Sequence, residues 1–187
     1  MAESKNNVIT RGLSGLIGDM IVFSNRHGKT IVSNKPKERT GVQSEVQKAH
    51  KAKFQQAILY AKASINDPTT TQGYKKASGD GVTPYNVAVA DFFRAPDFQS
   101  VDLSTYAGKI GDTIKVRVTD DFKVKEVSVT IQNADGTEVE KGNAVQMAGT
   151  DDWLFTAKKA NASLDGDKIV IRASDIPGNI SEMEEVI

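Results

Sequence analysis

The segment "GDKIVIRASDIPGNIS" (residues 166–181) alternates apolar side chains with other side chains at a period of two. Ile169, Ile171 and Ala173 share one face of a predicted strand, because successive side chains of a strand point to opposite faces. The "DIPGN" that follows is typical of a tight turn, in which proline fixes one dihedral angle and glycine supplies a positive one. The segment therefore predicts a half-buried antiparallel strand that ends in a turn.

The same period of two recurs earlier in the second half of the chain. It is carried by Ile114, Val116 and Val118 and by Val127, Val129 and Ile131. Turn signals separate these runs: "NADGTE", "GTDD" and "LDGDK". Short alternating strands at this spacing predict a seven-stranded antiparallel sandwich over residues 97–187. Residues 122–124 are out of phase with 127–131, which predicts a β-bulge near Lys125.

The first half has a different pattern. "DMIVFS" and "KTIVSN" flank "NRHG" and predict a β-hairpin. Ser44 and Gln47 fit a capping box at the start of a helix that "NDP" (66–68) ends. "TPYNVAVADFFRAP" (83–96) predicts a second helix, with Thr83 as N-cap. The fold class is therefore α+β: a hairpin with two helices over residues 1–96, then the sandwich domain over residues 97–187.

Three segments of the second half carry a resemblance to a known class of module. "GDTIKVRVTDDFKVKEVSVTI", "GTDDWLFTA" and the opening segment above resemble the bacterial immunoglobulin-like and fibronectin-III-like modules of surface and phage structural proteins. The resemblance implies an immunoglobulin-like sandwich. The first half is similar to an uncharacterised family of small bacterial proteins with a Gly-rich lead, a hairpin containing "HGK", a proline and a Gln-rich helix. That second resemblance implies no function.

The formal net charge of zero conceals opposite charges in the two halves. Residues 1–66 carry 11 Lys or Arg and 4 Asp or Glu, a net charge of +7, whereas residues 97–187 carry 10 and 17, a net charge of −7. Such a molecule can attract copies of itself head to tail. Two domains whose solvated faces happen to differ would give the same counts. The predicted basic assembly surface comprises Arg26, Lys29, Lys48, Lys51 and Lys53.

A set of acidic loops forms the second candidate site. In an immunoglobulin-like sandwich, alternate loops lie at one end. These loops would bring together five carboxylates and one amide, from Asp120, Asp121, Asp151, Asp152, Asp175 and Asn179. Hard oxygen ligands in that number suit calcium, which is the one cofactor that the sequence suggests. The competing and preferred interpretation of "DIPGN" is a plain turn, in which the aspartate bonds its own backbone.

Catalytic and nucleic-acid-binding patterns are missing from the sequence. The two histidines, His27 and His50, fall in a hairpin turn and on a helix stripe, places typical of structural histidines. "HGKT" lacks the glycine spacing and the following helix of a phosphate-binding loop. The lysine cluster lacks interleaved aromatic residues, so nucleic acid is not an expected partner. Trp153 is interpreted as the core aromatic of the sandwich, with a sugar-stacking platform as the alternative. We expect no enzymatic activity.

The remaining features concern location and function. "MAESKNNVIT" has no basic segment followed by an apolar run, so no signal peptide is expected, and the chain would stay in the cytoplasm or enter a particle. No stretch approaches the roughly 20 apolar residues of a membrane span. We expect a non-catalytic assembly protein, such as a subunit of a filament, a phage-like particle or an injection apparatus, that associates with itself or with other structural proteins. The alternative is a calcium-assisted binding module that recognises a glycan or a protein through the acidic loops.

Overall fold

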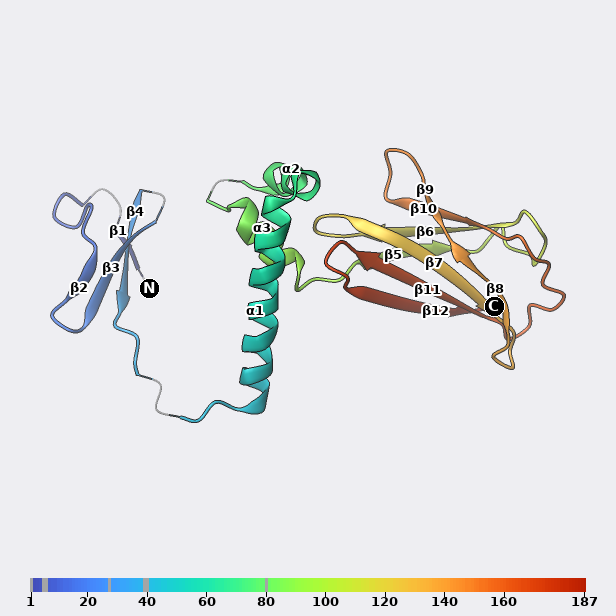
Figure 1. Ribbon diagram of the computed structural model, residues 1–187, viewed down its shortest axis with the longest axis horizontal. Coiled ribbons are helices and arrows are strands. Elements are labelled where there is room, and N and C mark those ends of the chain that lie inside the picture. Colours follow the sequence, from blue (N-terminus) through green and yellow to red (C-terminus); the bar gives the residue numbers. More distant parts are fainter. Residues whose placement is uncertain (1, 5–6, 27, 39–40, 80) are drawn as a thin grey trace. The chain divides into compact units, whose positions relative to one another are not determined.

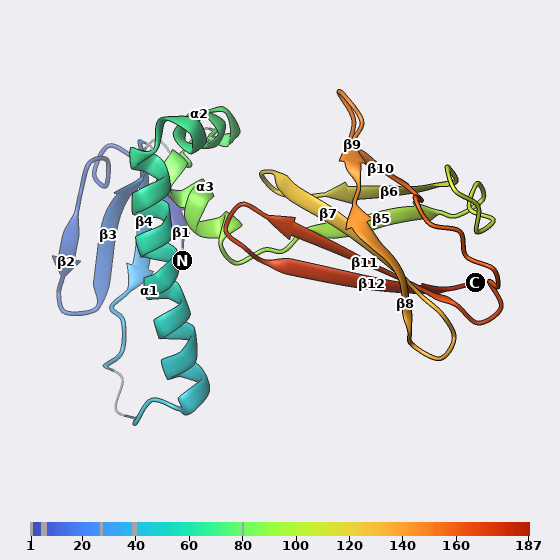
Figure 2. The same ribbon diagram turned by 45° about the vertical axis from the view of Figure 1, so that its right-hand side comes forward.

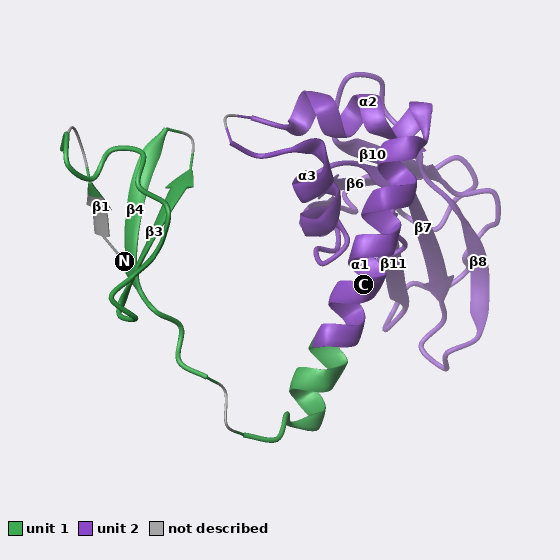
Figure 3. Cartoon of the chain, turned by 60° about the vertical axis from the view of Figure 1, so that its left-hand side comes forward, with its two compact units in different colours: residues 1–50 green, residues 51–187 purple. Residues whose placement is uncertain are grey.

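The computed structural model describes residues 2–4, 7–26, 28–38, 41–79 and 81–187. The chain divides into two compact units, residues 1–50 and residues 51–187 (Figure 3). The domain boundary predicted after Pro96 falls inside the second unit, because the helices before it pack against the sandwich that follows. The fold is mixed α+β, as predicted.

The first unit is a small antiparallel sheet. Its strands are β1 (Ala2–Ser4), β2 (Gly15–Ile17), β3 (Ile21–Arg26) and β4 (Lys29–Asn34), in the order β1-β4-β3-β2. The pair β3–β4 is the predicted hairpin, whereas β1 and β2 were not predicted. His27, in the turn of that hairpin, lies outside the described residues. Within the described part of this unit, Thr30 is the one buried side chain.

Helix α1 (Glu45–Asn66) begins at the predicted capping box. The Ser44 backbone N–H donates to Gln47 Oε1 at 3.1 Å, and the Gln47 N–H donates to Ser44 Oγ at 3.3 Å. The buried side chains of α1 all lie in the part that belongs to the second unit: Ala57, Ala61 and Ser64. No helix in the described part of the chain is long and apolar enough to cross a membrane.

Two shorter helices follow, where the sequence predicted one. Helix α2 (Pro68–Ala77) occupies the Thr-rich segment, because the Asp67 carboxylate accepts hydrogen bonds from the N–H groups of Thr69 and Thr70 and Pro68 takes the first helical turn. Helix α3 (Pro84–Asp91) has the predicted N-cap, with the Asn86 N–H donating to Thr83 Oγ1 at 3.3 Å. It ends before the predicted limit at Pro96. Figure 1 shows all three helices beside one end of the sandwich strands.

The sandwich has eight strands, one more than predicted. One sheet has the order β5-β6-β10-β9 and the other the order β12-β11-β7-β8, with every pair antiparallel (Figures 1 and 2). The bounds are β5 (Asp97–Asp102), β6 (Thr113–Thr119), β7 (Val124–Gln132), β8 (Glu138–Asn143), β9 (Val145–Gln146), β10 (Asp152–Thr156), β11 (Lys168–Asp175) and β12 (Ile180–Val186).

The core between the two sheets includes all of the predicted alternating residues. They are at most 1% exposed: Ile114, Val116, Val118, Val127, Val129, Ile131, Ile169, Ile171 and Ala173. Trp153 belongs to the same cluster and is 6% exposed, which confirms its prediction as a core aromatic. The bulge is confirmed as well: Asp175 pairs with Val124 and Ser174 with Glu126, which leaves Lys125 as the extra residue.

Candidate functional site

A buried hydrogen-bond chain runs through the helices of the second unit. The Tyr74 hydroxyl donates to Asp91 Oδ2 at 2.6 Å, and the hydroxyls of Tyr60 and Tyr74 lie 2.7 Å apart. Because the single proton of Tyr74 goes to Asp91, Tyr60 is the donor to Tyr74. Burial raises the pKa of Tyr74, and the hydrogen bond to Asp91 raises it further, so Tyr74 stays a neutral donor.

Asp91 is the last residue of α3 and is 1% exposed. Burial raises the pKa of its carboxyl to about 6. The Tyr74 hydrogen bond acts in the opposite direction, while the nearby charges of Asp120 and Asp175 raise the pKa further. Oδ2 of Asp91 accepts the hydrogen bond from Tyr74, whereas Oδ1 of Asp91 is buried and has no hydrogen-bond partner among the described residues. An unpaired buried carboxylate oxygen is costly.

Asp120 lies in the loop between β6 and β7. Its Oδ2 accepts hydrogen bonds from the N–H groups of Phe122 (3.1 Å) and Lys123 (2.8 Å), which shape this loop. Its Oδ1, like that of Asp91, is buried with no partner in the described part of the chain. One oxygen of this carboxylate therefore stabilises the loop, and the other oxygen has no hydrogen bond among the described residues.

Asp175 ends β11 and organises the turn to β12. Its Oδ1 accepts from the N–H groups of Gly178 (2.7 Å) and Asn179 (2.6 Å), as the predicted turn requires. Gly178 has a φ of +97°, a conformation that only glycine adopts readily. The Asn179 side-chain amide donates to Asp175 Oδ2 at 2.7 Å and to the Arg94 carbonyl at 2.8 Å. The turn is thus tied to the segment that follows α3.

These three aspartates form one cluster. Each offers a carboxylate oxygen that lies within 4.8 Å of those of the other two. Among the described residues, no lysine or arginine forms a salt bridge with any of them. Arg94, three residues after Asp91, pairs with exposed Asp121 instead. The arrangement leaves concentrated negative charge at the junction between the helices and the sandwich.

The structure therefore brings together only some of the residues of the predicted acidic site. Asp120, Asp175 and Asn179 meet at this junction. Asp152, on β10, instead pairs with Arg117, whose Nε lies 2.7 Å from Asp152 Oδ1, and Lys115 Nζ lies 3.7 Å from Oδ2. The Arg117 hydrogen bond lowers the pKa of Asp152. Asp151 is exposed and lies outside the three-carboxylate cluster.

Asp91 was missed from the sequence. The helix predicted over residues 83–96 places Asp91 in its interior, and an aspartate inside a helix does not by itself indicate a site. One signal was available: Asp91 is the only charged residue of α3, between Ala90 and Phe92. A lone carboxylate in an apolar helix indicates a specific partner.

The residues of the predicted assembly surface lie on strands and on α1. Arg26 and Lys29 face each other across the β3–β4 turn. On α1, Lys48 pairs with Glu45 at 2.8 Å, and Lys53 Nζ lies 5.5 Å from the centre of the Phe93 ring. Lys51 is exposed. Lys48 and Lys53 therefore each have a partner within their own unit.

Comparison with known proteins gives no family. No protein-family model and no curated protein matches the chain. Among solved structures, the crystal structure of CopC from Methylosinus trichosporium OB3b has a TM-score of 0.36 and 17% identity, covering 48% of this chain and 87% of CopC. An engineered protein has a TM-score of 0.35 and 15% identity, covering 55% of this chain and 26% of its own. Likenesses at this level carry no argument about function.

Proposed function

We propose that this chain is a non-catalytic assembly protein, a subunit of a filament, a phage-like particle or an injection apparatus. Copies join head to tail, with the basic first unit of one copy docked on the acidic sandwich of the next. The observation that supports this proposal is the group of exposed apolar side chains on the sheet of the first unit.

That sheet lacks a core of its own. Large apolar side chains on β2, in the turn after it and at the start of β3 are exposed: Leu16 by 50%, Ile17 by 51%, Met20 by 70% and Ile21 by 38%. Thr30 is the one buried side chain among the described residues of this sheet, and clustered exposed apolar side chains are typical of an interaction surface. The first unit therefore needs a covering surface, which the next copy would supply.

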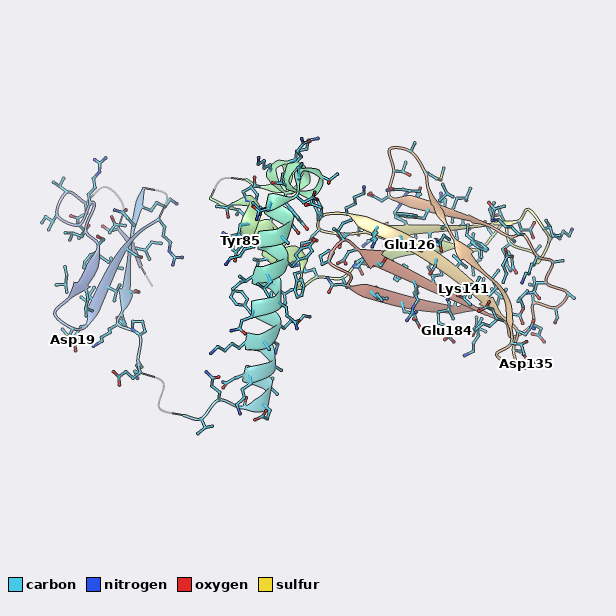
Figure 4. All side chains as sticks on the ribbon, in the orientation of Figure 1. Asp19, Tyr85, Glu126, Asp135, Lys141 and Glu184 are labelled. Atoms are coloured by element: carbon cyan, nitrogen blue, oxygen red, sulfur yellow. The ribbon has the colours of Figure 1, made fainter. Side chains whose placement is uncertain are left out.

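Charge supports the sandwich as the covering surface. Residues 1–50 contain 8 Lys or Arg and 4 Asp or Glu, a net charge of +4, against −7 for residues 97–187. The acidic side chains are spread along the sandwich, as Glu126 on β7, Asp135 in the β7–β8 turn and Glu184 on β12 show (Figure 4). Opposite charges steer such an encounter, and salt weakens it. Unpaired edges such as β2 add main-chain pairing between copies.

The experiment is light scattering across protein concentration at low (about 50 mM) and high (about 500 mM) salt. We expect mass to grow with concentration at low salt and to fall at high salt. The double variant Arg26→Glu/Lys29→Glu, which reverses two charges of the first unit, should keep a low mass, whereas Lys75→Glu/Lys76→Glu, a matched charge reversal on α2, should assemble like the wild type. A monomer under every condition would refute the proposal.

The alternative, a calcium-assisted binding module, has one supporting observation, the cluster of Asp91, Asp120 and Asp175. Two of these side chains are almost fully buried, at 1% and 0% exposure for Asp91 and Asp175. An ion held there suits a structural role better than contact with a glycan or protein ligand. The recognition half of this alternative stays a prediction.

A further inference from the structure

Three segments distant in sequence converge on the acidic cluster. Asp91 ends α3, Asp120 lies in the β6–β7 loop, and Asp175 ends β11. The first belongs to the helices and the other two to the sandwich. Whatever neutralises this cluster would therefore join the two parts of the second unit.

Besides its negative charge, the cluster contains buried oxygen atoms that have no hydrogen-bond partner among the described residues. Asp91 Oδ1 is a buried oxygen without a hydrogen bond, on a side chain that is only 1% exposed, and Asp120 Oδ1 is a second such oxygen. Buried polar atoms in proteins are almost always satisfied. Three carboxylates without a basic partner among the described residues also repel one another. A bound cation would satisfy the oxygens and cancel the repulsion together.

We propose that Asp91, Asp120 and Asp175 bind one divalent cation of the calcium type, which fastens the helices to the sandwich. The inference takes up the cation half of the alternative function, assigns it a different set of ligands, and does not depend on self-assembly.

Local hydrogen bonds already hold each carboxylate in place. Tyr74 holds Oδ2 of Asp91, and two backbone N–H groups hold Oδ2 of Asp120. The turn at 178–179 holds Asp175. Such outer contacts orient ligands in metal sites, and here they leave one oxygen each of Asp91 and Asp120 available.

Size and ligand type favour calcium. Calcium binds oxygens at about 2.3–2.6 Å, so two ligands on opposite sides of the ion stand about 5 Å apart. The separations within 4.8 Å in the cluster fit that span. Water would complete the coordination, since calcium takes about 6–8 ligands. A surface hollow of about 410 Å³ beside Asp120, lined also by Asp97 and Thr119, gives solvent a route to this edge of the cluster.

The test uses the full chain, freed of metal with a chelator and studied at pH 7.5. Isothermal titration calorimetry should show one Ca²⁺ bound per chain. The melting temperature should rise by about 5–10 °C when calcium reaches roughly a hundredfold excess over its Kd. Terbium, a luminescent calcium substitute, should be sensitised by excitation of the neighbouring tyrosines and displaced by Ca²⁺.

Variants locate the site. Asp91→Asn and Asp175→Asn should abolish calorimetric binding and the calcium-dependent rise in melting temperature. Asp91→Asn keeps the shape of the side chain and should melt at or above the metal-free wild type, since it relieves repulsion. Asp151→Asn, an exposed carboxylate outside the cluster, is the matched control and should respond like the wild type.

Three outcomes would overturn the inference. The first is that the wild type gives no heat of calcium binding in calorimetry and that calcium leaves its melting temperature unchanged. The second is full calcium binding by Asp91→Asn, and the third is loss of binding in Asp151→Asn. Light scattering on the same samples separates this result from assembly, because an ion inside one chain binds whether or not copies associate.

Discussion

Gly73 on α2 provides a sharp test of how the helices dock on the sandwich. A methyl group added there would lie 2.4 Å from Cζ and 2.6 Å from Cε2 of Phe122, which projects from the β6–β7 loop. Real side chains do not approach so closely, so Gly73→Ala must displace the ring. The Phe122 ring is stacked on Tyr74 with centroids 4.0 Å apart, and that stack would be disturbed.

Two opposing effects set the size of the change. In an exposed helix interior, replacing glycine by alanine stabilises by about 1 kcal/mol. Overpacking of a filled contact costs about 1–3 kcal/mol, and a disturbed aromatic pair costs about 0.5–1.5 kcal/mol more. The losses exceed the gain, and we expect Gly73→Ala to lower the free energy of unfolding by about 1–2 kcal/mol.

A second background reverses the sign. In a Phe122→Ala background the ring that meets the added methyl group is absent. Gly73→Ala should then raise the free energy of unfolding by about 1 kcal/mol. The coupling energy of the double-mutant cycle would then be about 2–3 kcal/mol. Urea unfolding, followed by circular dichroism, gives each free energy from its midpoint and slope.

The result that would refute this reasoning is specific. If Gly73→Ala stabilises the wild-type chain, Phe122 does not pack against α2 as described. An equal loss in both backgrounds would place the effect in the helix itself, with no contribution from the contact.

Three further predictions concern other parts of the chain. Arg117 lowers the pKa of Asp152, so the folded state binds the Asp152 proton more weakly than the unfolded state does; the pair therefore stabilises at neutral pH and loses its effect as pH falls through the depressed pKa. Melting temperatures of Asp152→Asn and wild type should differ at pH 7 and converge in acid, and a constant difference would contradict this. Ser44→Ala should weaken the α1 N-cap by about 1 kcal/mol and speed amide exchange in the first turn of α1, while exchange in the sandwich stays unchanged. Ile171→Ala, at 0% exposure, should lower the free energy of unfolding by about 2–5 kcal/mol in urea titrations, and a loss below 1 kcal/mol would place Ile171 outside the core.

Local chemistry explains which parts of the fold could be predicted. The strands of the sandwich bury one face in the core, so apolar residues recur at every second position of the sequence. The capping box at Ser44 and the bulge at Lys125 also depend on residues close together in the chain. These features were confirmed.

The missed elements depend on weaker or more distant contacts. Strands β1 and β2 are three residues each, too short for a period to appear. Helix α2 contains three threonines and a glycine, residues that disfavour helices, and it forms with the help of its Asp67 cap and its contact with Phe122. The acidic cluster joins residues 84 positions apart, from Asp91 to Asp175, and no local pattern shows that α3 ends beside the turn after β11.

The turn and the candidate ion site at "DIPGN" prove to be compatible, because they use the same carboxylate in different ways. Backbone N–H groups at 178 and 179 bind Oδ1 of Asp175 and thereby close the turn. The same two hydrogen bonds fix the direction of the carboxylate, and Asn179 links it to the carbonyl of Arg94 beyond α3. A turn that holds an acid rigidly lowers the entropy lost when that acid binds a ligand. A Gly178→Ala variant, strained at a φ of +97°, should therefore weaken calcium binding in calorimetry although residue 178 contributes no side-chain oxygen. Unchanged affinity in a folded Gly178→Ala protein would show that the turn does not position Asp175.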